Sequence, residues 1–332
     1  MPTPITDFDY HLPPEFIAQT QLIPRDSSRL LVVDRETGEA KDRHFYDIVE
    51  ELQAGDVLVF NSSKVFKARL LFGEIEILIL RIREGEADVL LRPGRKFAVR
   101  AALPLEGARV KAKEADGVVT IETGRTVAEM LDYCANYGVI PTPPYMEQGV
   151  DEVAYQTIYA KEVGSVAAPT AGLHFTPELI EKLKNKGIQT EYVTLHVGLG
   201  TFRPVQVETL EEHTMHGELV SIDEETVKRL VTAKNEGRRV IAVGTTTVRV
   251  LEGVAQKFGQ LQTYSGEINM FITPGFIFRV IDGLITNFHL PKSTLLVLVS
   301  ALAGRERVLA AYEQAKKFGY RFFSFGDAMF IS

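Results

Sequence analysis

Four turns of this sequence gather glycine, threonine and histidine beside apolar runs and helix starts. They contain Thr170, Gly172 and His174; His196, Gly198, Gly200, Thr201 and Arg203; Gly244, Thr245, Thr246, Thr247 and Arg249; and Asn287, His289, Lys292, Ser293 and Thr294. Histidine suits proton transfer near neutral pH, and the free N–H groups of helix starts attract anions. In open α/β sheets, ligands bind beyond the carboxyl ends of the strands, so we expect these turns to line one polar pocket.

Each turn also has a purely structural interpretation. Thr246 and Ser293 stand where N-cap residues stand, and a histidine beside an apolar strand is more often a hydrogen-bonded core residue than a catalyst. Gly198 and Gly200 form a G-x-G, but Arg203 occupies the place of the third glycine, so the dinucleotide-binding fingerprint fails. The coincidence of four such turns is what favours a ligand site.

Metal and nucleophile chemistry find less support. Histidines for a metal site exist at five positions: His174, His196, His213, His216 and His289. However, no H-E-x-x-H, C-x-x-C or H-x-H spacing occurs, so we predict a site without metal and keep a metal hydrolase as an alternative. There is no G-x-S-x-G motif, and Cys134 lies on an apolar, helix-like stretch, where we expect it in the core.

Strands and helices alternate along residues 151–332, which is typical of an α/β layer. Thr176 as N-cap, Pro177 at the first helical position and Gly187 at the end predict a helix over 176–187. Further helices are expected over 223–237, 245–259, 292–304 and 305–319, and strands over 190–200, 238–244, 284–289 and 321–331.

Residues 61–150 have a different pattern of apolar and turn residues. Short apolar runs at 68–72, 74–82, 87–93, 96–100, 108–115 and 117–123 alternate with turn residues, as in a small β-barrel or sandwich, and a helix is expected over 125–138. The predicted strand 56–60 runs directly into this segment, after an earlier strand at 28–35. We therefore predict a mixed-sheet α/β domain built from both chain ends, 1–60 and 151–332, with 61–150 inserted as a small β-barrel-like domain.

Composition places the chain among ordinary globular proteins. Its 332 residues are 45% hydrophobic and 24% charged, and the single cysteine fits a reducing compartment. The beginning of the chain lacks the basic and apolar regions of a signal peptide, and no apolar run is long enough to span a bilayer, so we expect a cytoplasmic protein that does not contact membranes. The net charge is −7, yet residues 61–113 carry 12 Lys and Arg against 6 Asp and Glu. That asymmetry suggests one local surface for a polyanion, but residues 114–150 add one basic and six acidic residues and bring 61–150 back to +1, so a basic surface and an evenly charged one stay open.

Long stretches of the chain resemble one known family. The stretches are "FDYHLPPEFIAQ", "RDSSRLLVVDR", "YGVIPTPPYM", "YQTIYAKEVGSVAAPTAGLHFT", "TLHVGLGTFRPV", "VIAVGTTTVRVLE", "ITNFHLPKSTLLVLVSALAG" and "RFFSFGDAMFI". They resemble the S-adenosylmethionine:tRNA ribosyltransferase-isomerases of queuosine biosynthesis, and they span nearly the whole chain. The sequence departs from the family at Asn61-Ser62-Ser63-Lys64, where the family carries Asn-Asp-Thr-Arg, and in a shorter β-rich segment.

The resemblance implies an unusual reaction. The ribosyl part of S-adenosylmethionine moves to 7-aminomethyl-7-deazaguanine at the wobble position of tRNA and is rearranged to give epoxyqueuosine, while adenine and methionine leave. A sulfonium acidifies the adjoining C–H bonds, so a neutral histidine is suited to act as base. The carboxylate of the nucleoside needs Arg, Lys or helix N–H groups.

The same resemblance suggests residue roles. His174 and His289 are the expected bases, and Asp327 is expected to move protons at the adenine or the amine. The expected binding residues for S-adenosylmethionine are Thr170, Gly172, His196, Gly198, Thr245, Thr246, Thr247, Lys292 and Ser293. Of these, Thr245 to Thr247, Lys292 and Ser293 are expected at the methionine carboxylate, and Arg203 at a phosphate or that same carboxylate.

For the tRNA anticodon arm, aromatic side chains would hold the wobble base and a basic surface would follow the backbone. The aromatic residues are Tyr145, Phe175, Phe202 and Phe288, each of which is expected at least as often in core packing, and the basic ones are Lys64, Lys67, Arg69, Arg92, Arg95 and Lys96. A monomer without an obligate protein partner or a metal is expected. A catalytically silent RNA-binding protein on the same fold is the alternative from a different class.

Overall fold

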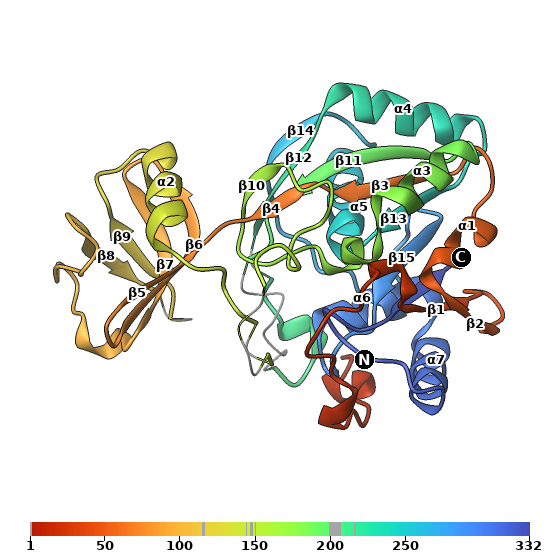
Figure 1. Ribbon diagram of the computed structural model, residues 1–332, viewed down its shortest axis with the longest axis horizontal. Coiled ribbons are helices and arrows are strands. Elements are labelled where there is room, and N and C mark those ends of the chain that lie inside the picture. Colours follow the sequence, from red (N-terminus) through yellow and green to blue (C-terminus); the bar gives the residue numbers. More distant parts are fainter. Residues whose placement is uncertain are drawn as a thin grey trace.

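The computed structural model describes residues 2–114, 117–143, 145, 146, 149, 151–198, 207–215 and 217–332. Gly200, Thr201, Phe202, Arg203 and His216, which the sequence singled out, lie outside the described residues. Figure 1 shows a larger α/β unit that holds both chain ends and a smaller β-rich unit beside it.

In the described part of the chain, nine strands form the main sheet. Their order is β14 (Tyr264–Ile268), β12 (Glu218–Ile222), β11 (Gln189–Leu195), β3 (Val57–Asn61), β13 (Val240–Val243), β15 (Gly283–Asn287), β16 (Ala328–Ile331), β1 (Arg29–Val33) and β2 (Ala40–His44). Strands β11, β3, β13 and β15 run parallel, while β12, β14 and β2 pair antiparallel towards the edges. Strand β16 is antiparallel to β15 and parallel to β1, so the two chain ends meet inside the sheet. The predicted mixed-sheet α/β class is confirmed.

Helices cover both faces of this sheet. One face packs against α4 (Glu224–Asn235), α5 (Thr245–Phe258), α6 (Thr294–Ala303) and α7 (Arg305–Lys317), and the other against α1 (Ile48–Glu51) and α3 (Pro177–Asn185). The central strands are therefore apolar throughout: in β3, Val57 and Val59 face the first cluster, whereas Leu58 and Phe60 face the second.

The predicted helix signals are observed at α3. Thr176 caps it by accepting the Leu179 N–H at 3.1 Å, Pro177 is its first residue, and Gly187 follows with a φ of 85°. Helix α5 differs, because it begins after Gly244 without a side-chain cap.

The smaller unit is an antiparallel sheet with one helix. Among the described residues its strand order is β5 (Arg69–Phe72), β6 (Ile75–Arg83), β7 (Glu86–Arg92), β9 (Val119–Glu122) and β8 (Arg109–Lys113). Helix α2 (Val127–Tyr137) packs on it through Met130 and Cys134, so the prediction that Cys134 belongs to the core is confirmed. The chain enters through β4 (Ser63–Val65), which pairs with β10 (Glu162–Ser165).

Two strand predictions were wrong in detail. Residues 96–100 form no strand, because the 3-10 turn Gly94–Lys96 precedes them and Arg100, with a φ of 71°, turns its N–H back onto the Val110 carbonyl at 2.7 Å. In the segment 321–331 only Ala328–Ile331 is a strand, since Asp327 accepts the Arg321 N–H at 2.7 Å and holds the preceding residues in a turn.

Candidate functional site

The carboxyl ends of four parallel strands meet at one edge of the main sheet, and the Asn61 side chain joins three of them. Its amide donates to the Leu195 carbonyl at 3.0 Å and to Thr246 Oγ1 at 3.2 Å. Its Oδ1 accepts the Leu195 N–H at 3.0 Å. Asn61 ends β3, Leu195 ends β11, and Thr246 follows β13, so this fully buried amide fixes the spacing of the three strand ends.

A cavity of about 50 Å³ lies at these strand ends, and we call it the strand-end cavity. The residues that line it come from all four predicted turns: Pro169, Thr170 and Ala171; Val197; Gly244, Thr245 and Thr246; and Thr286, Asn287, Phe288 and His289, with Ala168, Leu295, Phe323 and Ser324 beside them. The expected convergence of the four turns is therefore observed. The small volume leaves room for only part of a ligand.

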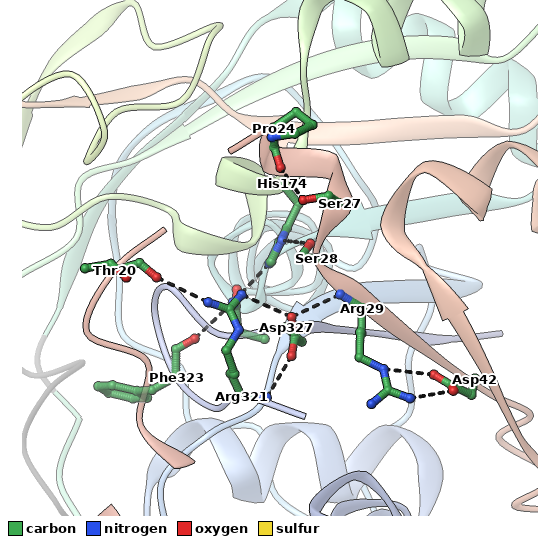
Figure 2. Close-up of polar contacts among 11 residues, drawn as sticks. Thr20, Pro24, Ser27, Ser28, Arg29, Asp42, His174, Arg321, Phe323 and Asp327 are labelled. Atoms are coloured by element: carbon green, nitrogen blue, oxygen red, sulfur yellow. Dashed lines mark hydrogen bonds and ion pairs between the residues drawn. The ribbon is translucent and has the colours of Figure 1, made fainter. Parts of the chain in front are cut away.

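His174 lies behind this cavity rather than in its wall. Its Nδ1 is 2.7 Å from Ser28 Oγ, its Nε2 is 3.1 Å from Asn287 Nδ2, and its ring stacks on Phe45 with the centroids 4.9 Å apart. Burial lowers the pKa of His174 to about 4, so the ring is neutral at pH 7. Because the Asn287 amide donates to Nε2, the proton of the neutral ring lies on Nδ1 and is directed at Ser28 (Figure 2).

The Asp327 carboxylate joins two backbone segments through hydrogen bonds. It accepts the N–H of Arg29 at 3.0 Å and the N–H of Arg321 at 2.7 Å, and Arg321 Nη2 lies 3.2 Å away (Figure 2). The carboxylate is 2% exposed and is not among the residues that line either cavity described here. These contacts fix the start of β16 against β1, and they favour a structural role over the expected proton transfer.

His289 lines the strand-end cavity directly. Its Nε2 is 3.2 Å from Thr286 Oγ1, and its Nδ1 has a long 3.4 Å contact with the Tyr312 hydroxyl. Burial lowers the pKa of His289 to about 3, so this ring is also neutral at pH 7. Of the two histidines expected to act as bases, His289 is the one beside space that a ligand can occupy.

Asn287 is a site residue that sequence reasoning named in a turn but did not assign. Its Nδ2 donates to His174 Nε2 and, at 3.1 Å, to the Phe323 carbonyl. Its Oδ1 is buried in the cavity wall and has no hydrogen-bond partner among the described residues. Buried polar atoms are nearly always bonded, so this oxygen is an open acceptor for an N–H or O–H group of a ligand. Only the tertiary structure reveals it.

Several expected binding residues have structural contacts instead. Thr247 donates to the Val243 carbonyl at 2.8 Å. Ser293 caps α6 by accepting the Leu296 N–H at 3.2 Å, and Lys292 pairs with Asp9 at 2.8 Å. Gly172 serves close packing, since a Cβ there would lie 1.9 Å from the Tyr159 hydroxyl. Thr170, Thr245 and Thr246 do line the strand-end cavity.

A second cavity of about 630 Å³, here the cleft cavity, lies between the two units. Phe66, Leu80, Arg81, Asp88, Val127 and Leu131 line it from the smaller unit, and His196, Gly198, Glu218, Arg249, Phe271 and Leu298 from the larger one. Leu295 lines both cavities, so the two adjoin. Arg81 of β6 also pairs with Glu267 of β14 at 2.9 Å and links the two walls.

His196 lies in the wall of the cleft cavity with Gly198. Its Nδ1 is 2.9 Å from Ser63 Oγ, and partial burial lowers its pKa. Gly164 makes this position possible, because a Cβ there would lie 2.8 Å from the imidazole ring. Ser63 belongs to the Asn61–Lys64 segment, which therefore reaches the site through His196.

The residues expected to contact RNA are dispersed. Tyr145 packs on Phe323 with ring centroids 4.2 Å apart and donates to Ser324, which lines the strand-end cavity. Phe175 and Phe288 are fully buried and pack in the core, and Phe288 also lines the strand-end cavity. Lys64 and Arg95 are exposed, on β4 and on the turn after β7, while Arg203 and Phe202 lie outside the described residues.

Two features are absent from the described residues. In that part of the chain, no group of three His, Cys, Asp or Glu side chains is arranged to hold a metal ion. No described helix has both the length and the apolar character needed to cross a bilayer.

Comparisons with known proteins agree with the geometry. A family model described as "queuosine biosynthesis protein" matches residues 5–331. S-adenosylmethionine:tRNA ribosyltransferase-isomerase of Carboxydothermus hydrogenoformans is 52% identical over 339 residues, which cover 98% of this chain and 99% of that protein. The crystal structure of S-adenosylmethionine tRNA ribosyltransferase from Thermotoga maritima matches with a TM-score of 0.60 and 40% identity over 98% of this chain and 100% of that one. The resemblance seen in the sequence is thereby confirmed, and the chain belongs to the queuosine biosynthesis protein family.

Proposed function

We propose that this protein transfers the ribosyl moiety of S-adenosylmethionine to 7-aminomethyl-7-deazaguanine at the wobble position of tRNA and isomerises it. The products are epoxyqueuosine-tRNA, adenine and methionine. The observation that carries the proposal is the 52% identity, over nearly the whole chain, to a protein named for this activity. The two adjoining cavities support it, because the larger has the volume of a typical small-molecule site and the smaller offers histidine, asparagine and threonine groups.

Proton transfer is assigned to His289 and His196. Both line a cavity, and burial lowers the pKa of each, which keeps the imidazole neutral and able to accept a proton at pH 7. A low pKa also makes a weak base, so the acidity that the sulfonium gives to its neighbouring C–H bonds is essential to this assignment. His174, which lines neither cavity, is assigned to hold Asn287 in place through the contact at its Nε2.

The nucleoside is proposed to lie across both cavities. Thr170, Thr245 and Thr246 supply hydroxyl groups at the strand-end cavity, and a Cβ at Gly198 in the cleft cavity would meet no atom of the described residues within 4 Å. The open Oδ1 of Asn287 is suited to accept from a ribose hydroxyl or an amine.

For the RNA, we propose that the smaller unit follows the anticodon arm and that Tyr145 lies near the wobble base. Arg92, Arg95 and Lys96 are exposed on neighbouring residues of that unit, and Lys64 is exposed on the connection to the larger unit. The wobble base sits in a loop, so little duplex energy opposes its entry into the cleft.

The finer organisation is also a proposal. We infer an insert over 61–150 that folds as a small β-barrel-like domain; its antiparallel five-strand order among the described residues supports this. We further propose that the protein is cytoplasmic, because its proposed substrate is tRNA. We also propose that it works as a monomer, without a metal and without an obligate protein partner.

Release of adenine tests the proposed function. The purified protein is incubated with S-adenosylmethionine and with tRNA that carries either guanine or 7-aminomethyl-7-deazaguanine, with and without a chelator. Adenine released only with the modified tRNA, and equally with chelator, is the expected result. Tight binding of tRNA without any adenine release would favour a catalytically silent RNA-binding protein instead, and loss of release with chelator would favour metal chemistry.

A further inference from the structure

Arg249 is a buried cation with open hydrogen-bond donors. It lies on the second turn of α5, is 6% exposed, and lines the cleft cavity. Its Nη1 pairs with the Glu218 carboxylate of β12. Its Nε and Nη2 are buried without a hydrogen-bond partner among the described residues. A buried guanidinium normally has its donors bonded, so two open nitrogens on one side chain require an explanation.

The two open nitrogens define the shape of the missing partner. In a guanidinium, the Nε–H and one Nη2–H point in the same direction along one edge of the plane. That edge accepts the two oxygens of a carboxylate in a bidentate pair. Glu218 occupies the opposite Nη1 position, so it orients the plane and leaves the Nε/Nη2 edge for a ligand.

The surroundings favour the carboxylate of a small molecule. Met270, Phe271 and Leu298 line the same cavity as Arg249, and its volume of about 630 Å³ is that of a small-molecule site. A buried guanidinium in such a wall is out of reach for the exposed backbone of a polyanion. On the opposite wall, Arg81 and Asp88 are paired with Glu267 and Arg83, so they do not compete for the same ligand group.

We propose that Arg249 binds the α-carboxylate of the methionyl part of S-adenosylmethionine through Nε and Nη2, and that Glu218 holds the guanidinium in position. This assignment rests on the proposed function. It replaces Lys292 and Ser293, which the sequence suggested for the same carboxylate and which pair with Asp9 and cap α6.

The test compares two ligands that differ only in this group. Binding of S-adenosylmethionine and of its decarboxylated analogue, S-adenosylmethioninamine, is measured by calorimetry in the presence of saturating tRNA that carries guanine and therefore permits no turnover. The unaltered protein is expected to bind the analogue on the order of 10- to 100-fold more weakly, which is the range for a charge-assisted bidentate pair.

Two variants connect that difference to the residue. In Arg249→Gln the preference for the carboxylate is expected to fall to about threefold or less. Arg249→Lys retains a point charge, so its preference is expected to lie between those of the unaltered protein and Arg249→Gln. Lys257→Gln removes one positive charge from an exposed position of the same helix and is expected to keep the full preference. If loss of the charge beside Glu218 prevents Arg249→Gln from folding, Arg249→Lys alone provides the comparison with the unaltered protein.

The proposal is overturned if the unaltered protein binds both ligands equally, or if a folded Arg249 variant keeps the full preference. Either result is compatible with tRNA-dependent adenine release, so the proposed function would stand. Conversely, a carboxylate preference that depends on Arg249, in a protein that never releases adenine, would sustain this site and reject the proposed function.

Discussion

At the scale of single residues, the two histidines of the strand ends show how burial sets chemistry. Both His174 and His289 are almost fully buried, and desolvation lowers the pKa of each because a charged imidazolium loses its water. The two rings differ in position. Both have polar contacts at both nitrogens, but His289 lines the strand-end cavity and His174 lies behind it.

The pKa of His174 makes stability depend on pH. An unfolded histidine takes up its proton near pH 6.5, whereas folded His174 does so only near pH 4. The unfolded state therefore binds more protons in this window, and the contribution of His174 to stability, complete above about pH 6.5, is lost as the pH falls towards 4. Between pH 7 and pH 5 the loss from this residue is on the order of 1–2 kcal/mol.

Urea unfolding at pH 7 and pH 5 checks this expectation. The unaltered protein should lose more free energy of unfolding between these pH values than His174→Gln, whose side chain does not titrate. His11→Gln, a change at an exposed histidine, should behave like the unaltered protein. An identical pH dependence in His174→Gln would show that the imidazole is not held in the neutral, bonded state described above.

At the scale of elements, the sequence predicts well where local signals are strong. The apolar strands β1, β3, β13 and β15 and the helices α3 to α7 were all anticipated, because caps, glycine stops and buried periodicity are local features. Strands β2, β12 and β14 were not. β2 is "AKDRH" with four exposed residues, and β14 is "YSGEI", so neither carries the apolar pattern of a strand, and pairing at the sheet edge creates both.

The candidate site, too, could be predicted from the sequence only in part. The four turns could be anticipated because each follows a strand or starts a helix. The sequence could not predict which side chain of a turn faces the cavity. Thr246 and Thr247 are neighbours, yet Thr246 lines the strand-end cavity and Thr247 donates to the backbone of β13. The open donors of Arg249 depend on Glu218, which lies 31 positions earlier on an unpredicted strand.

Ser293 gives a prediction at this scale. As the N-cap of α6 it accepts the Leu296 N–H, so Ser293→Ala should lower the free energy of unfolding by about 1 kcal/mol. Ser293→Asn, which retains a capping oxygen, should restore most of that loss. The KM for S-adenosylmethionine in the adenine-release assay should be nearly unchanged in both. A large rise in KM for Ser293→Ala without loss of stability would instead identify the hydroxyl as a ligand for the nucleoside.

At the scale of the whole molecule, the smaller unit carries exposed cations although the chain as a whole is acidic. The chain has a net charge of −7, yet Arg92, Arg95, Lys96, Arg100 and Arg109 are all exposed on the smaller unit. Within the described residues none of the five forms a salt bridge. The Arg100 N–H donates to the Val110 carbonyl and the Lys113 ammonium donates to the Gly94 carbonyl, so the segments that carry these cations lie along β8.

This basic surface leads to a prediction about salt. Each phosphate that a cation contacts adds about 0.7–0.9 to the slope of log affinity against log salt concentration. Replacing Arg92, Arg95 and Lys96 with Gln should therefore weaken tRNA binding and flatten that slope by roughly 2 to 3, measured by fluorescence anisotropy from 50 to 200 mM salt. The affinity for S-adenosylmethionine should not change, because these side chains are not among those lining either cavity.

A charge-matched control separates a local surface from the overall charge. Replacing Lys182, Lys184 and Lys186 with Gln removes the same three charges from α3 and its end, which Figure 1 places on the side of the larger unit away from the smaller one. If both triple variants flatten the slope equally, the net charge of the protein governs its attraction to RNA. If only the variant in the smaller unit does so, the smaller unit carries the surface that holds tRNA, and its position beside the cleft cavity allows one bound tRNA to reach the proposed nucleoside site.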